Sequence, residues 1–232
     1  MGGDLNEERY AQLFHWLTDS QIDFDYGEEE MMSRLASVDT ENGVPVLRVG
    51  NAAYRTVIVS NMLTVRPSTL ALLTEFSDLG GRIIFCGDAP EYVDAIRSDL
   101  PAALADRSMR IPFEERALVN AVRDGDGEFV SVVNERGETA KTVFAQVRKS
   151  FGGDGYAVAL LNTDRENATD GLVLRLKAPE GYAVTEWSSE TGERFDASAL
   201  SCFADGVYNI KTKLDAAGTR FFVLTAERDY IF

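Results

Sequence analysis

The segment LLNTDREN, residues 160–167, places six polar side chains in a row after the apolar run YAVALL. Two carboxylates, a guanidinium and two amides so close together offer ligands for a sugar, a phosphate or a metal ion. The same residues suit the end of a strand, because Asn162 and Thr163 can form side-chain-to-backbone hydrogen bonds in a turn. No complementary group lies nearby in the sequence. We therefore interpret the segment as a strand end with a solvated Asp-Arg-Glu triplet.

A second candidate is Cys86 in FCGDAP, because glutamine-amidotransferase-like folds place a nucleophilic cysteine between a strand and a helix. Such a cysteine needs a base that holds it as a thiolate and a sharp turn of small residues. Phe85 precedes Cys86, and the only histidine in the chain, His15, lies upstream. An amidotransferase-like enzyme using Cys86 remains an alternative hypothesis. Two buried free thiols, Cys86 and Cys202, are the simpler interpretation.

Metal and phosphate sites are not predicted. In the acidic run IDFDYGEEE, a calcium loop counted from Asp23 would need glycine sixth and glutamate twelfth, but Gly27 falls fifth and Arg34 twelfth. Zinc sites need clustered cysteine and histidine, and glycine-rich phosphate loops are absent from the sequence. We expect an acidic first helical turn after Gly27, with no metal, no cofactor and no catalytic residue in this chain.

Composition limits the partners. The 232 residues include 38 acidic and 23 basic side chains, and the resulting net charge of -15 repels nucleic acid and anionic membrane surfaces. No apolar stretch approaches the roughly 20 residues that cross a bilayer, and MGGDLNEERY lacks a signal-peptide pattern. The sequence therefore predicts a globular protein in the cytoplasm with neither nucleic acid nor membrane as partner.

The first half alternates helical and strand periods. Apolar spacing predicts a helix over 6–18, and Pro67 at a first turn with Gly80-Gly81 behind it predicts a helix over 67–79. Strand followed by helix, repeated with short loops, is typical of a parallel sheet covered on both faces. The further strands expected are IDFDY, YRTVIVSN, RIIFCGD and RSMRIPF, and the further helices are EEEMMSRLA, PEYVDAIRSDL and EERALVNAVRD.

The period changes after the Asp124-Gly125-Asp126-Gly127 turn signal. About seven strand-length runs follow without a helix, which indicates an antiparallel β-sandwich. We therefore predict two domains, residues 1–126 and 127–232. The expected strands are EFVSVVNE, TVFAQVRKS, GYAVALLN, GLVLRLKA, YAVTEWSS, GVYNIKTKL and TRFFVLTAE.

Four segments resemble large bacterial glycoside hydrolases of the alpha-L-rhamnosidase type. The segment from YRTVIVSN to FCGDAPEYVD is similar to a "Y-x-x-V-I-V-P … G-G-x-V-I-x-x-G-x-x-P" pattern of that group, and DFDYGEEEMMSRLASV resembles "D-F-x-x-x-E-x-x-L". Downstream, FAQVRKSFGGDGYAVALLNTDREN resembles "Q-x-R … Y-x-x-x-x-N-T", and VTEWSSETGE resembles a "W-x-x-x-T-G-E" hairpin. The four occur in the family's order.

This resemblance implies where the chain lies within a larger protein, and it implies less about the chain's activity. In that family the catalytic carboxylates lie on a (β/α)8 barrel of about 250 residues, so none is carried over to this chain. The matching segments follow the barrel. They imply a flavodoxin-like accessory domain, which related beta-galactosidases use for oligomerisation, and then a C-terminal β-sandwich. The partners implied are an upstream catalytic barrel or a second copy of the chain.

The leading hypothesis is a non-catalytic C-terminal region of a glycoside hydrolase, with a structural, oligomerisation or substrate-side role. A carbohydrate-binding module is a second alternative, because exposed aromatic rings stack on sugars. Its candidate contacts are Trp187, Tyr182 and Tyr208, together with Phe203, although aromatic residues in strands commonly belong to the core. Thr191-Gly192 is expected in the turn of a hairpin that contains Trp187.

Overall fold

The computed structural model describes residues 2–126, 129–149 and 155–226. By their contacts, residues 1–14 and 25–127 form one compact unit, and residues 15–24 and 128–232 form a second. The predicted domain boundary lies between residues 126 and 127. Residues 127 and 128, which follow it, are outside the described residues. Residues 15–24 join the later part of the chain, which a division at one point of the sequence does not anticipate.

Helix α1 (Gly2–Asp19) confirms the helix predicted over 6–18. The strand expected at IDFDY is wrong, because residues 22–26 pair with no described strand. Individual side chains hold the end of this segment instead. Tyr26 stacks on Tyr10 with ring centroids 4.8 Å apart, and the Tyr54 hydroxyl donates to the Asp25 carboxylate at 2.6 Å.

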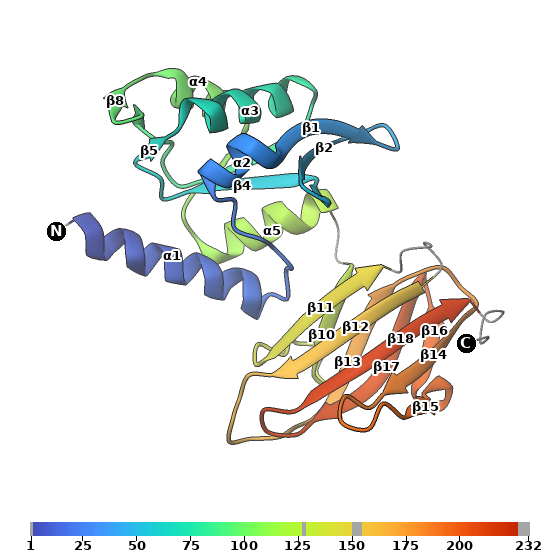
Figure 1. The fold of residues 1–232 in the computed structure, drawn as a ribbon. Helices are drawn as coiled ribbons and strands as arrows, with labels where there is room; N and C mark the ends of the chain where they lie inside the picture. Colours follow the sequence, from blue (N-terminus) through green and yellow to red (C-terminus); the bar gives the residue numbers. More distant parts are fainter. Residues whose placement is uncertain (1, 127–128, 150–154, 227–232) are drawn as a thin grey trace. The chain divides into compact units, whose positions relative to one another are not determined.

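The first unit contains the predicted parallel sheet. It consists of β4 (Thr56–Ser60), β6 (Arg82–Cys86) and β9 (Met109–Ile111), in that order. Residues Ile83 to Cys86 are all buried. Since successive side chains of a strand point to opposite faces, β6 is covered on both sides. Helices α3 (Pro67–Asp78) and α5 (Glu115–Asp126) lie on opposite sides of β4 (Figure 1).

Local signals fix α3. Pro67 occupies its first turn, where a missing N–H costs nothing, and Leu70, Leu73 and Phe76 are buried on one face. The glycine pair ends the helix for two reasons. Gly80 has φ +84°, and a Cβ on Gly81 would come within 2.3 Å of the Phe76 ring.

The sequence patterns missed an antiparallel sheet in the first unit. The expected helix EEEMMSRLA ends at Leu35, where α2 (Glu29–Leu35) gives way to β1. The sheet is made of β1 (Ala36–Glu41), β2 (Val44–Val49) and β3 (Ala52–Tyr54). Its first turn is Asn42-Gly43, both residues at positive φ, which is the strongest short signal for a two-residue hairpin.

The helix expected across PEYVDAIRSDL starts late. Most of that segment forms β7 (Tyr92–Val93) and β8 (Ile96–Arg97), which extend a small sheet begun by β5 (Thr64–Val65). Asp94 and Ala95, between β7 and β8, have φ of 46° and 63°, so the chain turns there and cannot continue as a helix. Helix α4 (Leu100–Asp106) then begins at Leu100.

The second unit contains two antiparallel sheets. All seven predicted strands are present, and two short ones, β15 and β16, were missed. One sheet has the order β10-β13-β17-β16, with β10 (Val130–Val133), β13 (Thr169–Lys177), β17 (Val207–Leu214) and β16 (Ser201–Ala204). The other has the order β11-β12-β18-β14-β15, with β11 (Val143–Lys149), β12 (Gly155–Asn162), β18 (Thr219–Ala226), β14 (Tyr182–Trp187) and β15 (Arg194–Asp196).

Both sheets contribute to one apolar core. Leu174 and Ile210 from the four-stranded sheet lie in it with Leu160 and Phe222 from the five-stranded sheet, and none of the four is more than 1% exposed. The described residues therefore form a mixed α/β structure whose sheets include the parallel sheet, antiparallel sheets and the small mixed sheet of β5, β7 and β8.

The predicted Asp124-Gly125 turn is helical, because α5 continues to Asp126. A Cβ on Gly125 would overlap the Arg82 guanidinium. That guanidinium donates to the carbonyls of Ala121 and Val122. Gly125 thus acts here by making room for the Arg82 side chain.

Candidate functional site

A pocket of about 480 Å³ opens at the carboxyl end of the parallel sheet. Strands β6 and β9 are parallel neighbours in which Cys86 lies opposite Ile111, so the loops that follow them leave the same edge. The Gly87 N–H donates to the Ile111 carbonyl at 2.9 Å and holds these loops together. Ligands of open α/β sheets commonly bind outside this edge.

Charged side chains from three elements line this pocket. Arg9 comes from α1, Asp88 from the loop after β6, and Arg110 from β9. The Arg9 guanidinium lies over the Phe113 ring, 5.3 Å from its centroid, and Phe113 also lines the pocket. Arg110 pairs with Asp106 at 2.9 Å. Among the described residues, no carboxylate pairs with Arg9 and no cation pairs with Asp88.

Cys86 lies next to this pocket in the sequence but is fully buried. Its thiol hydrogen-bonds to the Pro112 carbonyl at 3.8 Å, and burial raises the pKa of the Cys86 thiol. A nucleophilic cysteine needs an exposed thiolate with a lowered pKa. The alternative of an amidotransferase-like enzyme using Cys86 therefore conflicts with the geometry. The second thiol differs from its expectation, because Cys202 is exposed.

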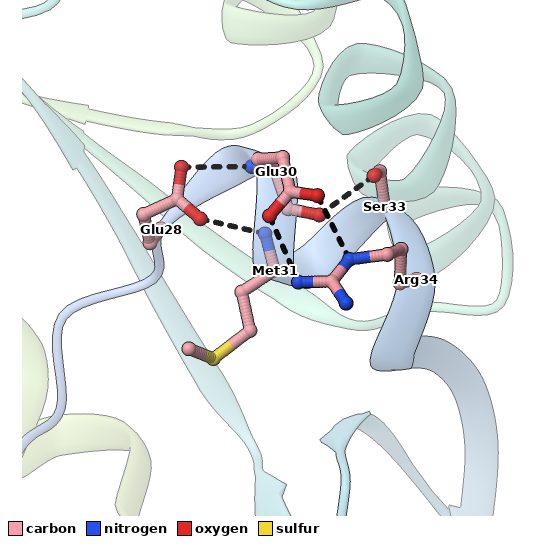
Figure 2. A network of polar contacts seen from close by, with 5 residues as sticks. All are labelled: Glu28, Glu30, Met31, Ser33 and Arg34. Atoms are coloured by element: carbon pink, nitrogen blue, oxygen red, sulfur yellow. Dashed lines mark hydrogen bonds and ion pairs between the residues drawn. The ribbon is translucent and has the colours of Figure 1, made fainter.

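The acidic run after Gly27 caps a helix. Figure 2 shows the Glu28 carboxylate accepting from the backbone N–H groups of Glu30 and Met31, at 2.9 and 2.6 Å. These bonds lower the pKa of Glu28, with the Glu30 N–H as the largest cause. Glu30 in turn pairs with Arg34 one turn later, at 2.8 Å. The carboxylates thus stabilise α2 as expected, and no cluster of metal-ligating side chains is found in the described residues.

The LLNTDREN segment is a strand end, as predicted. Asn162 closes β12 and is 1% exposed. Its amide donates to the carbonyls of Asn167 and Asp215, at 2.8 and 3.0 Å, and its carbonyl accepts from the Asp164 N–H. The Asp164 carboxylate accepts from the Glu166 and Asn167 N–H groups, which lowers its pKa. The side chains of Asn162 and Asp164 thus form hydrogen bonds within the turn and its neighbouring loop.

Three of the four candidate sugar contacts lie in or against the core of the second unit. Tyr208 is 5% exposed, and its hydroxyl accepts from the Tyr182 N–H at 2.6 Å. Tyr182 and Phe203 are half-buried against the same core. The Tyr208 ring therefore leaves little surface for a sugar, in line with the common place of strand aromatic residues in the core.

Trp187 lies apart from those residues. Its indole N–H donates to the Thr185 hydroxyl at 3.0 Å, and the Arg194 guanidinium stacks on its ring, 4.2 Å from the centroid. The hairpin predicted around Thr191-Gly192 is present. Gly192 has φ +72°, and its N–H donates to the Ser188 carbonyl at 3.0 Å.

Trp187 lies in an apolar row on the face of the five-stranded sheet away from the core. Phe221 is its cross-strand neighbour, and Ala159 lies opposite Phe221 on the next strand. Phe144 and Leu161 form the next cross-strand pair. Phe221 and Leu161 are 37% and 38% exposed. This set, the outer-sheet row, is a partly exposed apolar surface bordered by Gln146 opposite Ala159 and by the Arg194 guanidinium on the Trp187 ring.

Sequence reasoning missed the pocket residues Arg9, Arg110 and Phe113. One signal was available, because RIIFCGD and RSMRIPF are both predicted as strands of a parallel sheet, and the loops that follow such strands meet at one edge of the sheet. No local pattern connects Arg9 to that edge, since it lies about a hundred residues earlier in the chain.

No family model and no curated protein matches this chain. Solved structures do match its fold. A rhamnosidase from Novosphingobium sp. PP1Y aligns over 92% of this chain with a TM-score of 0.66 and 18% identity. An exo-carrageenase GH42 from Bacteroides ovatus aligns over 94%, with a TM-score of 0.53 and 14% identity. An alpha-L-fucosidase isoenzyme 2 from Paenibacillus thiaminolyticus aligns over 93%, with a TM-score of 0.54 and 8% identity.

These neighbours are glycoside hydrolases, and this chain spans only part of each. It covers 21% of the rhamnosidase, 26% of the carrageenase and 44% of the fucosidase. The fold of this chain thus resembles part of a rhamnosidase, as the sequence segments suggested. None of the helices in the described residues is long and apolar enough to cross a membrane.

Proposed function

We propose that the chain is a non-catalytic accessory region of a glycoside-hydrolase-type protein, formed by a flavodoxin-like α/β unit and a β-sandwich. The observation that carries this proposal is the asymmetry of the rhamnosidase match, which takes in 92% of this chain and 21% of the other. A likeness of that kind fits a region placed beside a separate catalytic part. The burial of Cys86 and the use of the Asn162 and Asp164 side chains within a turn agree with it.

Hydrolysis of aryl glycosides tests the proposal. The panel should include an α-L-rhamnoside and an α-L-fucoside, the sugars named for two structural neighbours. We expect no more aryl alcohol from the chain than from a heat-denatured sample of it. Robust turnover by the native chain that is lost in Asp88→Asn would refute the proposal, because Asp88 is the only carboxylate that lines the described pocket.

The partner proposed for this role is an upstream catalytic barrel or a second copy of the chain. Light scattering over a wide concentration range separates these cases. A mass that doubles with concentration supports self-assembly. A constant single-chain mass leaves the barrel as the proposed partner.

A second candidate function is carbohydrate contact through Trp187. The outer-sheet row favours it, because Trp187 and Phe221 stand side by side on a face that the core does not use. Tyr182 and Tyr208 contribute from the core side, by supporting the strands and not by touching a sugar. Aromatic rings commonly provide the large contact areas of binding surfaces.

Isothermal titration with oligosaccharides tests this second function. We expect heat of binding from the chain and its loss in Trp187→Ala. Tyr26→Ala is the matched control, because Tyr26 is a 49% exposed ring in the other unit. The absence of heat from the unaltered chain would refute carbohydrate binding and would leave the proposed accessory role unaffected.

A further inference from the structure

The pocket at the carboxyl end of the parallel sheet has features of a ligand site that the accessory role does not require. Its volume of about 480 Å³ lies within the range of small-molecule sites. Its floor is the edge of β6 and β9, two strands held in register from Ile84 opposite Met109 to Cys86 opposite Ile111. The site is thus built on a rigid element, as precise binding requires.

Gly87 shapes the wall of the pocket. It has φ +90°, a conformation that residues with a Cβ rarely adopt, and a Cβ there would lie 3.4 Å from Cβ of Phe113. This backbone path lets the Gly87 N–H bond to the Ile111 carbonyl while Asp88 turns outward to line the pocket. The conformation of Gly87 and its hydrogen bond to Ile111 therefore fix the backbone of the loop where it lines the pocket.

The charges of the pocket run against those of the chain. The whole sequence carries a net charge of -15, yet two guanidinium groups and one carboxylate line this concavity. Arg9 is half-buried over the Phe113 ring, and among the described residues no carboxylate pairs with it. Arg110 is held by Asp106 in a pair whose side chains are 53% and 70% exposed, which an incoming anion can displace at little cost.

Each group selects part of a ligand. The planar guanidinium of Arg9 presents donors in the geometry of a carboxylate, and stacking on Phe113 orients it before binding. Asp88 accepts hydrogen bonds from hydroxyl groups and repels a second anionic group. We propose that this pocket binds a small hydroxylated carboxylate, such as a sugar acid, with its carboxylate on Arg9 and Arg110 and a hydroxyl donating to Asp88.

Titration with D-glucuronate followed by NMR or calorimetry tests this site. Glucose, which lacks the carboxylate, and acetate, which lacks the hydroxyls, are the ligand controls. We expect glucuronate to bind more tightly than either. Arg9→Gln should weaken glucuronate binding about tenfold or more, the loss of roughly 1.4 kcal/mol that one charge-assisted bond provides. Asp88→Asn should weaken glucuronate binding relative to acetate binding, because only glucuronate has hydroxyl groups that donate to Asp88.

The matched control is Arg107→Gln. Arg107 is an arginine of the same unit that pairs with Asp78 on the surface and does not line the pocket. Should Arg9→Gln disturb α1, Arg110→Gln tests the same carboxylate contact from the sheet. Three results would overturn the inference. The first is equal affinity of the chain for glucuronate and glucose, the second is a loss of glucuronate binding in Arg107→Gln as large as in the pocket variants, and the third is no binding of glucuronate at all. This inference is independent of the accessory role, because the ligand site is tested by titration and the accessory role is tested by hydrolysis.

Discussion

Removal of the Gln21 side chain amide is predicted to destabilise the second unit. Gln21 is 4% exposed, and its amide connects residues 15–24 to the two sheets. Its Nε2 group donates to the carbonyls of Val132, Ala140 and Val143 at 3.1, 3.1 and 3.3 Å. Its Oε1 accepts from the Val132 N–H at 2.6 Å. Gln21→Ala deletes all four contacts.

The cost can be estimated contact by contact. The carbonyls of Val132 and Ala140 keep a backbone partner each, since they also accept from the N–H groups of Ala140 and Val143 at 2.9 Å. They lose only a second bond. The Val132 N–H loses its described partner, and a buried donor left unsatisfied costs about 1–3 kcal/mol. With the bonds donated by Nε2, we expect Gln21→Ala to lower the free energy of unfolding by about 2–4 kcal/mol.

Urea denaturation followed by tryptophan fluorescence measures this loss. The chain has two tryptophans, Trp16 and Trp187, and both belong to the second unit, so the signal reports on that unit. Gln146→Ala is the matched control, because Gln146 is a half-buried glutamine of β11 with no described side-chain hydrogen bond. It should change stability by less than about 0.5 kcal/mol. An equal effect of the two substitutions would refute the role assigned to the Gln21 amide.

Three further predictions concern single residues. In the native chain a thiol reagent at neutral pH should label Cys202 and not Cys86, and in urea it should label both; rapid native labelling of Cys86 would contradict its burial. Gly192→Val should cost about 1 kcal/mol or more, because φ is +72° with open space around it, whereas Gly192→Asn should cost less; an unchanged melting temperature in both would contradict the turn. The pKa of Asp164 is lowered in the folded chain, so its carboxylate stabilises the fold above the unfolded pKa of about 4, and this stabilisation is lost as pH falls through the lower folded pKa. Asp164→Asn should therefore destabilise the fold at pH 7, and the difference in stability from the parent should shrink as the pH is lowered below about 4.

The elements that the sequence predicted well are those with complete local signals. Pro67 and the Gly80-Gly81 pair mark both ends of α3, and the alternation of YAVALLN marks β12, because helix caps and strand faces are set by neighbouring residues. The Asn42-Gly43 hairpin carried an equally local signal and was overlooked. The helix expected at PEYVDAIRSDL was wrong for a different reason. Its apolar spacing suits a helix, but the turn at Asp94 and Ala95 replaces it.

The candidate site depends on contacts that no local pattern records. The pocket requires Arg9 to meet loops near residues 87 and 112, and a sequence window of one helix cannot contain them. The burial of the aromatic candidates could not be predicted for a related reason, because alternation places Tyr208 and Trp187 in strands but does not state which face the core will occupy. Register decides that. With Phe222 and Leu224 inward, Phe221 and its neighbour Trp187 face outward.

Gln21 also changes how the chain can be divided. A break between residues 126 and 127 would separate the second unit from the segment 15–24. The Val132 N–H would then lose its acceptor, and Arg148 would lose its ion pair with Asp23 at 2.5 Å. The exposed ion pair matters little, whereas the buried amide matters much. The β-rich unit is therefore completed by residues from the beginning of the chain, and we propose domains that are compact in space but discontinuous in sequence.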